Sequence, residues 1–504
     1  MSLRDRVRSL FKSSDEFDLT SGEIAKPLLY LSFPIVVTNL FQTAYNLADT
    51  FWLGQHSTNA LAAISFAFPM VFLLISLAIG LSVAGSVLVA QHVGAEQFRK
   101  AEYAASQTVA FSVILSIVVG AIGYVFAGEM VALLGADPEY APQVVSYMEV
   151  FSAGLVFVFG FAMFIALMRG YGDTITPMIV MFGSVVLNIV LDPFLIFGFQ
   201  ENPLFAWFSL QGLEATLYET TGFDGRGIEG AAIATIVSRA LAFGVGLWIM
   251  FRGNRGVRIR LGQMMPDLSY ARTMLDIGVP ASVEMTGRAI SVNLMLVIVA
   301  LFSTTTVAAY GIGTRIFSVV FLPAIAFSQG IETMTGQNIG AGKPDRAART
   351  NDYGARFLFV ILTVVGAVTF LAARPISAIF TTDPAVADAS ATFLRIVAPT
   401  FGFMGIMRAY NGGFRGAGKT LIAAAIAFTV LGVVRLPVAW VGANTIGSSG
   451  LWLAFAVSNV AGAVLAYWWF KRGTWREGDL TSSSFGGDEI ESEDVVNSSA
   501  SGND

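Results

Sequence analysis

Long apolar stretches alternate with short polar segments along most of this chain. Each stretch contains at least about 20 mainly apolar residues, the length that a helix needs to cross a bilayer. Six stretches lie in the first half and six in the second, so the pattern predicts twelve transmembrane helices in an all-α fold. They begin near Pro27, Ala60, Ala104, Ala141, Thr174 and Ile228, and then near Met274, Val307, Arg356, Ala387, Leu421 and Gly450.

The two halves repeat short motifs at one distance. Three motifs of the first half recur 246 residues later, and beyond Gly227 the offset falls to 220, which places an insertion at 199–226. This register implies two copies of one six-helix fold, and internal repeats in an apolar chain are typical of secondary transporters. The matching motifs are Pro34 and Pro280, Gln91-x-x-Gly94-Ala95 and Gln337-x-x-Gly340-Ala341, and Arg169-Gly170-x-Gly172-x-Thr174 and Arg415-Gly416-x-Gly418-x-Thr420.

Lys and Arg gather on one side of the predicted topology. With the N-terminus taken as cytoplasmic, the inner segments contain 21 of these residues and the outer loops only Arg226 and Arg374. Cytoplasmic loops carry this excess, so we expect a multi-pass protein of the plasma membrane with both termini in the cytoplasm. Six crossings per half also give both repeats the same orientation.

The boundaries between apolar and polar sequence predict five parts. The last part is rich in Ser, Gly, Asp and Glu and cannot bury enough apolar surface to fold, so we expect a disordered acidic tail. The parts are a basic cytoplasmic N-terminus at 1–26, a first six-helix lobe at 27–252 with the external insertion at 199–226, a basic cytoplasmic linker at 253–271, a second six-helix lobe at 272–476 and the cytoplasmic tail at 477–504.

The composition limits the chemistry. Hydrophobic residues make up 55% of the chain and charged residues 13%, against roughly 45–50% and about 25% in soluble domains. The absence of cysteine excludes disulfides, thiol catalysis and thiolate metal sites. His56 and His92 lie at opposite ends of one predicted helix, too far apart for a shared metal. We therefore expect a membrane protein that is not an enzyme, needs no cofactor and binds no nucleic acid.

One segment matches a nucleotide-binding motif. Gly413-Phe-Arg-Gly-Ala-Gly418-Lys419-Thr420 fits the phosphate-loop pattern G-x-x-x-x-G-K-[ST]. That loop must follow a strand in an α/β domain, whereas this segment joins two predicted membrane helices, and its counterpart has Asp173 in place of the lysine. We interpret it as a tight glycine-rich turn and expect no bound nucleotide.

Carboxylates within the membrane are the main functional candidates. A carboxylate at mid-span costs roughly 2.5–3.5 kcal/mol on insertion scales. Asp49 and Asp192 lie near the outer ends of the first and fifth helices. Asn188 lies one turn deeper than Asp192 on the same face, and Thr235 enters the sixth helix to a similar depth. These oxygens suit Na⁺ or, through the carboxylates, a proton. The alternative is structural, with the acids paired to arginines or Asp49 reaching the interface.

The second half differs at the corresponding positions, which are Met295 and Val438, so a cation site would belong to the first half. Glu284 and Arg288 are spaced i, i+4 and are expected to pair, as are Glu149 and Arg239. Glu284 is nevertheless a candidate for a second ionisable site. Arginines within or near the helices of this half are Arg288, Arg315, Arg395, Arg408 and Arg435.

The chain resembles the multidrug and toxic compound extrusion family over roughly residues 18–472. In that family two six-helix lobes form a V around a central cleft, and Na⁺ or H⁺ is exchanged for organic cations by alternating access. The resemblance implies a cation site at Asp49, Asn188, Asp192 and Thr235, and a first-helix bend at Pro34. It rests on Asn46-Leu-Ala-Asp49-Thr-Phe-Trp-Leu-Gly54, Ala90-Gln91-x-x-Gly94-Ala95, Arg169-Gly170-x-Gly172-Asp173-Thr174, Asn188-x-x-x-Asp192-Pro193, Gly230-Ala231-Ala232-x-Ala234-Thr235 and Arg435-Leu-Pro437.

We therefore expect a monomeric secondary antiporter that exports organic, mostly cationic drugs or toxic metabolites in exchange for Na⁺ or H⁺. The main alternative is a flippase for lipid-linked saccharides or other anionic lipids, in which the arginines of the second half bind head groups. A passive channel is a weaker alternative, because two duplicated halves with few buried acids fit a transporter with rocking lobes better than a charged pore. An ATP-driven pump would need the phosphate loop interpreted above as a turn.

Overall fold

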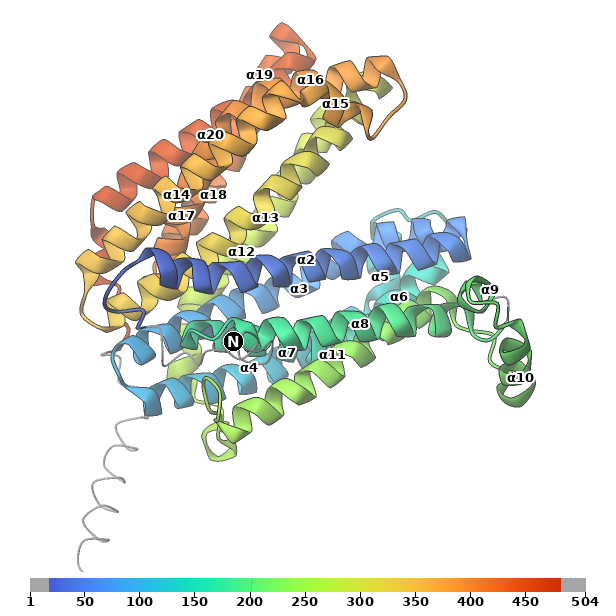
Figure 1. The fold of residues 1–504 in the computed structure, drawn as a ribbon, viewed down its shortest axis with the longest axis horizontal. Coiled ribbons are helices and arrows are strands. Elements are labelled where there is room, and N and C mark those ends of the chain that lie inside the picture. Colours follow the sequence, from blue (N-terminus) through green and yellow to red (C-terminus); the bar gives the residue numbers. More distant parts are fainter. Residues whose placement is uncertain (1–17, 201, 482–504) are drawn as a thin grey trace, which may run out of the picture.

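The computed structural model describes residues 18–200 and 202–481, and all regular structure within these ranges is helical. Eleven helical segments of the described residues are long and apolar enough to cross a membrane, and two of them, Pro384–Gly416 and Thr420–Ile446, each combine consecutive helical elements. A twelfth span is formed by α6 (Ala141–Ala153) and α7 (Leu155–Tyr171), which meet at a 55° bend. The predicted fold class, twelve membrane helices in two six-helix lobes arranged as a V, is confirmed (Figure 1).

The helices of the two repeats correspond in order. Those of the first lobe, besides α6 and α7, are α2 (Ala25–His56), α3 (Thr58–Gly94), α4 (Phe98–Val125), α5 (Ala127–Leu133), α8 (Ile175–Phe197) and α11 (Gly227–Arg252), and the insertion forms α9 (Pro203–Trp207) and α10 (Gln211–Thr221). Those of the second lobe are α12 (Leu268–Val299), α13 (Thr304–Gly340), α14 (Pro344–Leu371), α15 (Ala373–Ala378), α16 (Pro384–Val397), α17 (Phe401–Gly416), α18 (Thr420–Phe428), the π-helix η4 (Thr429–Arg435), α19 (Leu436–Ile446) and α20 (Ser448–Lys471).

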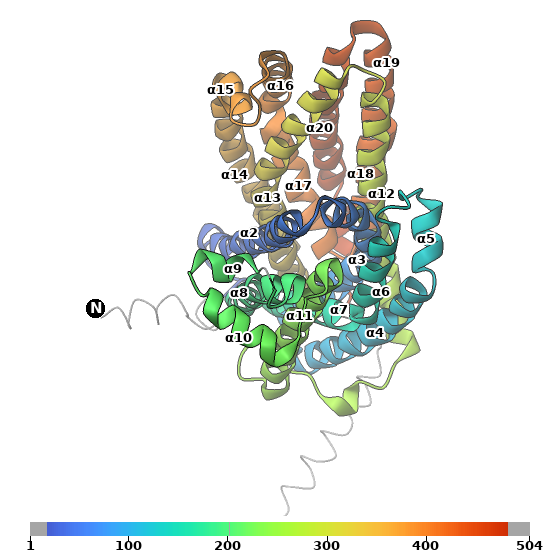
Figure 2. The same cartoon turned by 90° about the vertical axis from the view of Figure 1, so that its right-hand side faces the viewer.

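The first helix of each repeat belongs to the cores of both lobes. Near the narrow end of the V, Leu28 and Leu31 of α2 pack into the core of the second lobe, whereas Tyr45 of α2 packs into the core of the first. In α12, Met274 lies in the core of the first lobe and Met295 in that of the second. Accordingly, α2 packs against α13 and α12 packs against α3 across the junction (Figure 2).

The repeated Gln-x-x-Gly-Ala motifs join the lobes at the narrow end. The side-chain amide of Gln91 in α3 donates a hydrogen bond to the carbonyl oxygen of Gly416 at 3.1 Å. The amide of Gln337 in α13 donates to the carbonyl oxygen of Gly170, also at 3.1 Å. Both glycines belong to the repeated Arg-Gly motif. The Gln-x-x-Gly-Ala motif of each repeat therefore binds the Arg-Gly motif of the other repeat.

Two glycines allow the backbones of α3 and α13 to touch at this point. A Cβ atom added to Gly94 would clash with the backbone of Gln337, and one added to Gly340 would clash with the backbone of Gln91. The neighbouring atom is backbone in both cases and cannot rotate away. These positions therefore require glycine because of the close approach.

The ordered chain extends beyond the predicted start of the acidic tail. Residues 477–481 were assigned to the disordered tail, but the Leu480 N–H donates to the Gln91 side-chain oxygen at 2.8 Å and the Gly478 carbonyl accepts from the Gln91 amide at 3.0 Å. Trp475 is buried against Phe470. The prediction is wrong for these five residues, because their backbone groups hydrogen-bond at the junction and the Leu480 side chain packs against the core of the first lobe. The remaining tail and residues 1–17 lie outside the described residues.

The linker ends earlier than the sequence indicated. Helix α12 begins at Leu268 rather than near residue 272, because the Asp267 carboxylate caps it by accepting hydrogen bonds from the Ser269 and Tyr270 N–H groups. Burial of Asp267 would raise its pKa, but hydrogen bonds from the Ser269 and Tyr103 hydroxyls and the helix backbone outweigh that and hold the pKa below its ordinary value. The aspartate therefore stays ionised. Its hydrogen bond from the Tyr103 hydroxyl joins the end of the linker to α4.

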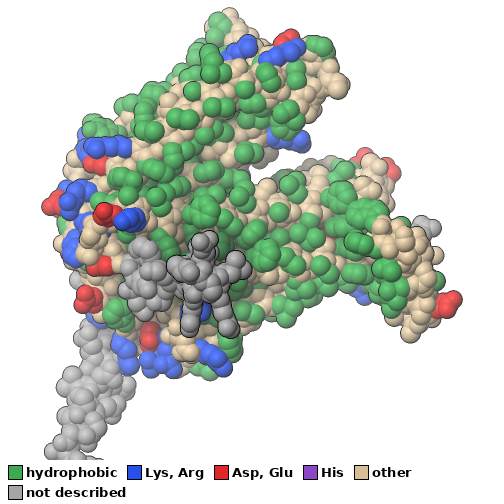
Figure 3. All heavy atoms as spheres, in the orientation of Figure 1, with side chains coloured by type: hydrophobic (Ala, Val, Ile, Leu, Met, Phe, Trp, Pro, Cys, Tyr) green, Lys and Arg blue, Asp and Glu red, His purple; other side chains and the backbone are tan. Residues whose placement is uncertain are grey.

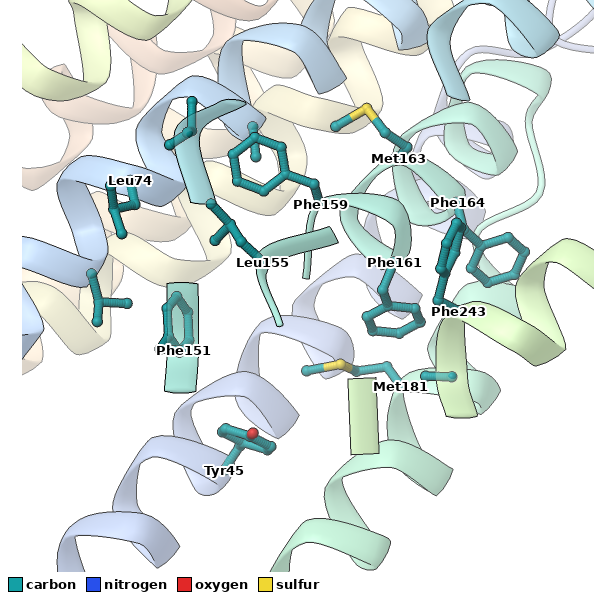
Figure 4. Packing of buried hydrophobic residues seen from close by; sticks show 14 of the residues in the cluster. Tyr45, Leu74, Phe151, Leu155, Phe159, Phe161, Met163, Phe164, Met181 and Phe243 are labelled. Carbon is teal, nitrogen blue, oxygen red and sulfur yellow. The ribbon is translucent and has the colours of Figure 1, made fainter. Parts of the chain in front are cut away.

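Aromatic side chains packed onto glycines hold the first lobe together. Phe164 of α7 covers Gly246 of α11, and Phe243 of α11 covers Gly160 of α7 (Figure 4). A Cβ atom at either glycine would overlap the ring. Reciprocal packing of this kind brings the two helices close, as small residues do at helix contacts within membranes.

We expect Gly94→Ala and Gly340→Ala to destabilise the closed narrow end, because each added methyl group overlaps backbone of the opposite lobe. Overpacking typically costs about 1–3 kcal/mol, so the melting temperature should fall and a cysteine pair placed across the junction should crosslink more slowly.

Gly244→Ala is the matched control, since nothing lies within 4 Å of a Cβ atom added to this exposed glycine of α11. Equal melting temperatures and crosslinking for all three variants would contradict the assigned contact.

Candidate functional site

A large cavity lies between the arms of the V. Its volume is about 1080 Å³, and the space-filling view shows the opening between the two lobes (Figure 3). We call it the central cavity. Most of its wall comes from the first lobe, through α2, α3, α5, α6, α7 and α11, and α12 closes the other side. Its polar lining includes Gln42, Asn46, Asp49, Thr235, Arg239, Arg288 and Asn293.

Two of the four predicted cation-site residues are hydrogen-bonded to each other, and a third lies within electrostatic range of them. The Asn188 side-chain amide donates a hydrogen bond to Asp192 Oδ1 at 3.0 Å, which confirms that the two lie on one face of α8. The Asp49 carboxyl group, from α2, is within electrostatic range of Asp192. Asp49 is 4% exposed and Asp192 is fully buried. Two ionised carboxylates buried near each other repel unless a proton or cation lies between them.

All four predicted residues have an oxygen without a partner. Asp49 Oδ1, Asn188 Oδ1, Asp192 Oδ2 and Thr235 Oγ1 are buried and accept no hydrogen bond within the described part of the chain. Leaving such atoms unsatisfied is costly. A cation fits this set of oxygen ligands, since carboxylate, amide and hydroxyl oxygens can all ligate Na⁺ and a carboxylate can bind a proton. The functional role of these residues stays a prediction.

Arg239 is a member of this site that the sequence analysis assigned elsewhere. The expected pair with Glu149 is not formed. Instead the Arg239 guanidinium, from α11, donates to the Gln42 side-chain oxygen at 2.8 Å and lies 4.6 Å from the centre of the Tyr45 ring. It is also within electrostatic range of Asp49. The contacts come from α2, and no spacing within α11 could have revealed them.

The insertion covers the end of α2 that carries Asp49. The ring of Trp207 in α9 lies 5.3 Å from that of Trp52 and 6.3 Å from that of Phe51. Trp52 is three residues beyond Asp49 and is buried. The insertion therefore shields the open end of the first lobe beside the acidic site.

A buried charge cluster joins the lobes deeper in the junction. Arg415 Nε lies 2.9 Å from Glu332 Oε2, and Arg415 Nη1 lies 3.2 Å from Glu284 Oε1. Arg169 of the first lobe approaches the other oxygen of Glu332 at 3.8 Å. All four side chains are less than 10% exposed. The cluster contains two cations and two anions, so its charges balance.

The expected pair between Glu284 and Arg288 is therefore wrong. Both carboxylate oxygens of Glu284 accept hydrogen bonds from Arg415, a residue of α17 that only the tertiary fold brings near. This pairing makes Glu284 a member of the junction, although it is the candidate that we predicted for a second ionisable site. No structural feature tests a bend at Pro34, which lies within the continuous helix α2.

The family model MatE matches residues 34–194 and 280–441, one segment in each lobe. The chain belongs to the MatE family. This membership confirms the resemblance found in the sequence and identifies the protein as a member of a multidrug efflux transporter family, which supports a function other than catalysis.

Individual MatE relatives match over nearly their whole length. The chain is 29% identical to a probable multidrug resistance protein NorM of Thermotoga maritima, covering 90% of this chain and 94% of the relative. It is 27% identical to a FAD transporter of Shewanella oneidensis, covering 91% and 97%. In fold it is similar to a Vibrio cholerae MATE transporter in a bent form, with a TM-score of 0.79, 22% identity, and coverage of 91% and 98%.

We expect Glu332→Gln to destabilise this MatE protein strongly. The substitution leaves Arg415 and Arg169 with a single buried anion, and removing one partner of a buried pair costs about 3–5 kcal/mol. The check is the thermal unfolding midpoint of the purified protein in detergent.

Glu229→Gln is the control, because Glu229 forms a more exposed pair with Arg226, and such surface pairs are worth roughly 0–1 kcal/mol. Equal unfolding midpoints for the two variants would show that the buried cluster does not hold the lobes together.

Proposed function

We propose that this MatE protein is a secondary antiporter that exports organic, mostly cationic drugs or toxic metabolites in exchange for Na⁺ or H⁺. It acts as a monomer by alternating access. The observation that carries the proposal is the set of four unpartnered buried oxygens on Asp49, Asn188, Asp192 and Thr235. These atoms form a place for one small cation beside a cavity large enough for a drug-sized molecule.

Orientation follows from charge. The narrow end of the V has many charged side chains (Figure 3). Arg99 and Lys100 lie in the first turn of α4, and Lys343 precedes α14, a few residues beyond the Gly94–Gly340 contact. We place this end in the cytoplasm because cytoplasmic segments collect Lys and Arg. The central cavity then opens to the outside, and the structure represents an outward-facing state.

Ion entry supplies the driving force. One positive charge crossing inward gains about 2.3 kcal/mol per 100 mV of membrane potential, which corresponds to a concentration ratio of tens-fold for exported substrate. When a proton or Na⁺ binds between Asp49 and Asp192, it removes the repulsion between these carboxylates. The first lobe can then repack, and the junction at the narrow end must open for the cavity to face inward.

The cavity wall suits lipophilic aromatic substrates. Phe68, Phe72, Phe151 and Phe161 line it together with Met70 and Met130. Aromatic faces attract organic cations, and methionine adapts to ligands of different shape. The relatives named as a multidrug resistance protein and as a FAD transporter indicate that flavins belong among the compounds to test.

The flippase alternative is not favoured. The family match and the relatives described above are to multidrug exporters and a flavin nucleotide transporter. No lipid-linked saccharide is needed to account for the acidic site on α2 and α8.

We expect Asp49→Asn and Asp192→Asn each to reduce gradient-driven efflux of a fluorescent organic cation from proteoliposomes by about 10-fold or more, because the amide can neither bind a proton nor contribute a charge. Na⁺ and pH gradients are imposed separately, and the gradient that drives efflux in the wild type identifies the coupling ion.

Asp276→Asn serves as the control, since Asp276 is an exposed carboxylate on α12, far along the helix from the cavity residues. Efflux that is independent of both gradients, or unchanged in the two site variants, would sink the proposal.

A further inference from the structure

Within the described residues, three arginines of the second lobe have no acidic partner. Arg408 is 3% exposed, and Arg288 and Arg435 are half-buried. Within residues 18–200 and 202–481, no carboxylate lies within ion-pair distance of any of the three. The two acids nearby, Glu284 and Glu332, are already paired with Arg415. The interior of this lobe therefore has an excess of positive charge.

Each of the three guanidinium groups lies over an aromatic ring. Arg288 from α12 and Arg408 from α17 both lie over the ring of Phe321, at 4.4 Å and 4.2 Å from its centre. Arg435 lies 4.4 Å from the centre of the Phe455 ring and is within electrostatic range of Arg288. Such contacts recover only part of the cost of removing a cation from water.

Unused hydrogen-bond donors remain in this group, which we call the arginine cluster. Arg408 Nε and Nη2 are buried and donate to nothing in the described part of the chain. Arg435 donates to the Ser458 hydroxyl at 2.8 Å, a neutral acceptor. Arg435 also ends the π-helix η4, and single π-turns inside α-helices are frequent at functional sites.

One member of the cluster lines the central cavity. Arg288 lines that cavity together with Thr286 and Asn293 of the same helix. Its counterpart position in the first lobe is Gln42, and the acids Asp49 and Asp192 correspond to the apolar Met295 and Val438. The same fold therefore offers a negative site in one lobe and a positive site in the other, with the cavity between them.

We propose that the arginine cluster binds an oxyanion, a carboxylate or phosphate, carried by an aromatic substrate of the exporter. The proposal names a substrate class and so rests on the proposed function. A guanidinium presents paired N–H donors that match the oxygens of these anions. Phe321 and the aromatic residues of the cavity would contact the flat part of the same molecule.

The test compares two flavins that differ in one group. Flavin mononucleotide carries a phosphate and riboflavin does not, while their aromatic rings are identical. Equilibrium binding to the purified protein, in detergent without added lipid, is measured by flavin fluorescence. We expect the mononucleotide to bind the wild type at least about 10-fold more tightly, because charge-assisted contacts in a desolvated site contribute strongly to affinity.

Arg288→Gln and Arg408→Gln should each abolish most of this preference while leaving riboflavin binding within about two-fold, since only the phosphate contact is lost. Arg408→Lys keeps the charge without the paired donors, so its preference for the mononucleotide should lie between those of the wild type and Arg408→Gln. Arg356→Gln, an exposed arginine of α14, is the control and should match the wild type. Retained riboflavin binding shows that a variant is folded. Equal affinities for the two flavins, or a preference that survives both Gln variants, overturns the proposal.

A second arm separates the two sources of phosphate. Binding is repeated in bilayer discs of phosphatidylcholine with and without phosphatidylglycerol. We expect the mononucleotide affinity to be the same in both. If the anionic lipid displaces the flavin, the cluster binds a lipid head group and the substrate proposal fails. Because binding is measured without a gradient, a failure of ion coupling would leave this result unchanged, so the two proposals fail separately.

Discussion

The structure depends on the sharing of α2 and α12 between both lobes. Each helix packs with one half in its own lobe and with the other half in the opposite lobe. A change of angle between the lobes must therefore bend or repack these helices, and cannot simply separate two surfaces. Pro34 and Pro280 lie close to the points where each helix passes between cores. Proline removes a backbone hydrogen bond and weakens a helix at that position, so the crossing points coincide with the places where bending costs least.

The contacts at the narrow end are polar and directional. Gln91 and Gln337 bind backbone carbonyl groups of the opposite repeat, and the cluster around Arg415 balances its charges. Within a membrane, apolar contacts give little preference for protein over lipid, whereas close backbone packing and polar contacts do. Hydrogen bonds of this kind have two clear states, formed and broken. Under the proposed alternating-access cycle, such bonds suit a junction that closes in one conformation and opens in another.

The two lobes share a fold but differ in charge. Asp49 of α2 lines one side of the central cavity, and Arg288 of α12, which lies over the Phe321 ring, lines the other. Gene duplication explains the common backbone, because helix length and glycine positions are set by the membrane and by packing. The charges are free to diverge, since each depends on a few side chains in contact. Arg239 shows this clearly: it lies beside Asp49, while the corresponding residue of the second lobe is Asn459, a weak acceptor for Arg435.

The sequence by itself determined the twelve helices and the two repeats, because both depend on local apolar length and on matched spacing. It also grouped Asn188 with Asp192, since residues four apart share a helix face. The sequence did not reveal which side chains on distant helices pair with each other. Arg415 with Glu284, Arg239 with Gln42 and Leu480 with Gln91 each join segments more than 100 residues apart, where side-chain period carries no information. Only the tertiary structure decided them, because a buried charge takes whichever partner the packing of the helices brings within reach.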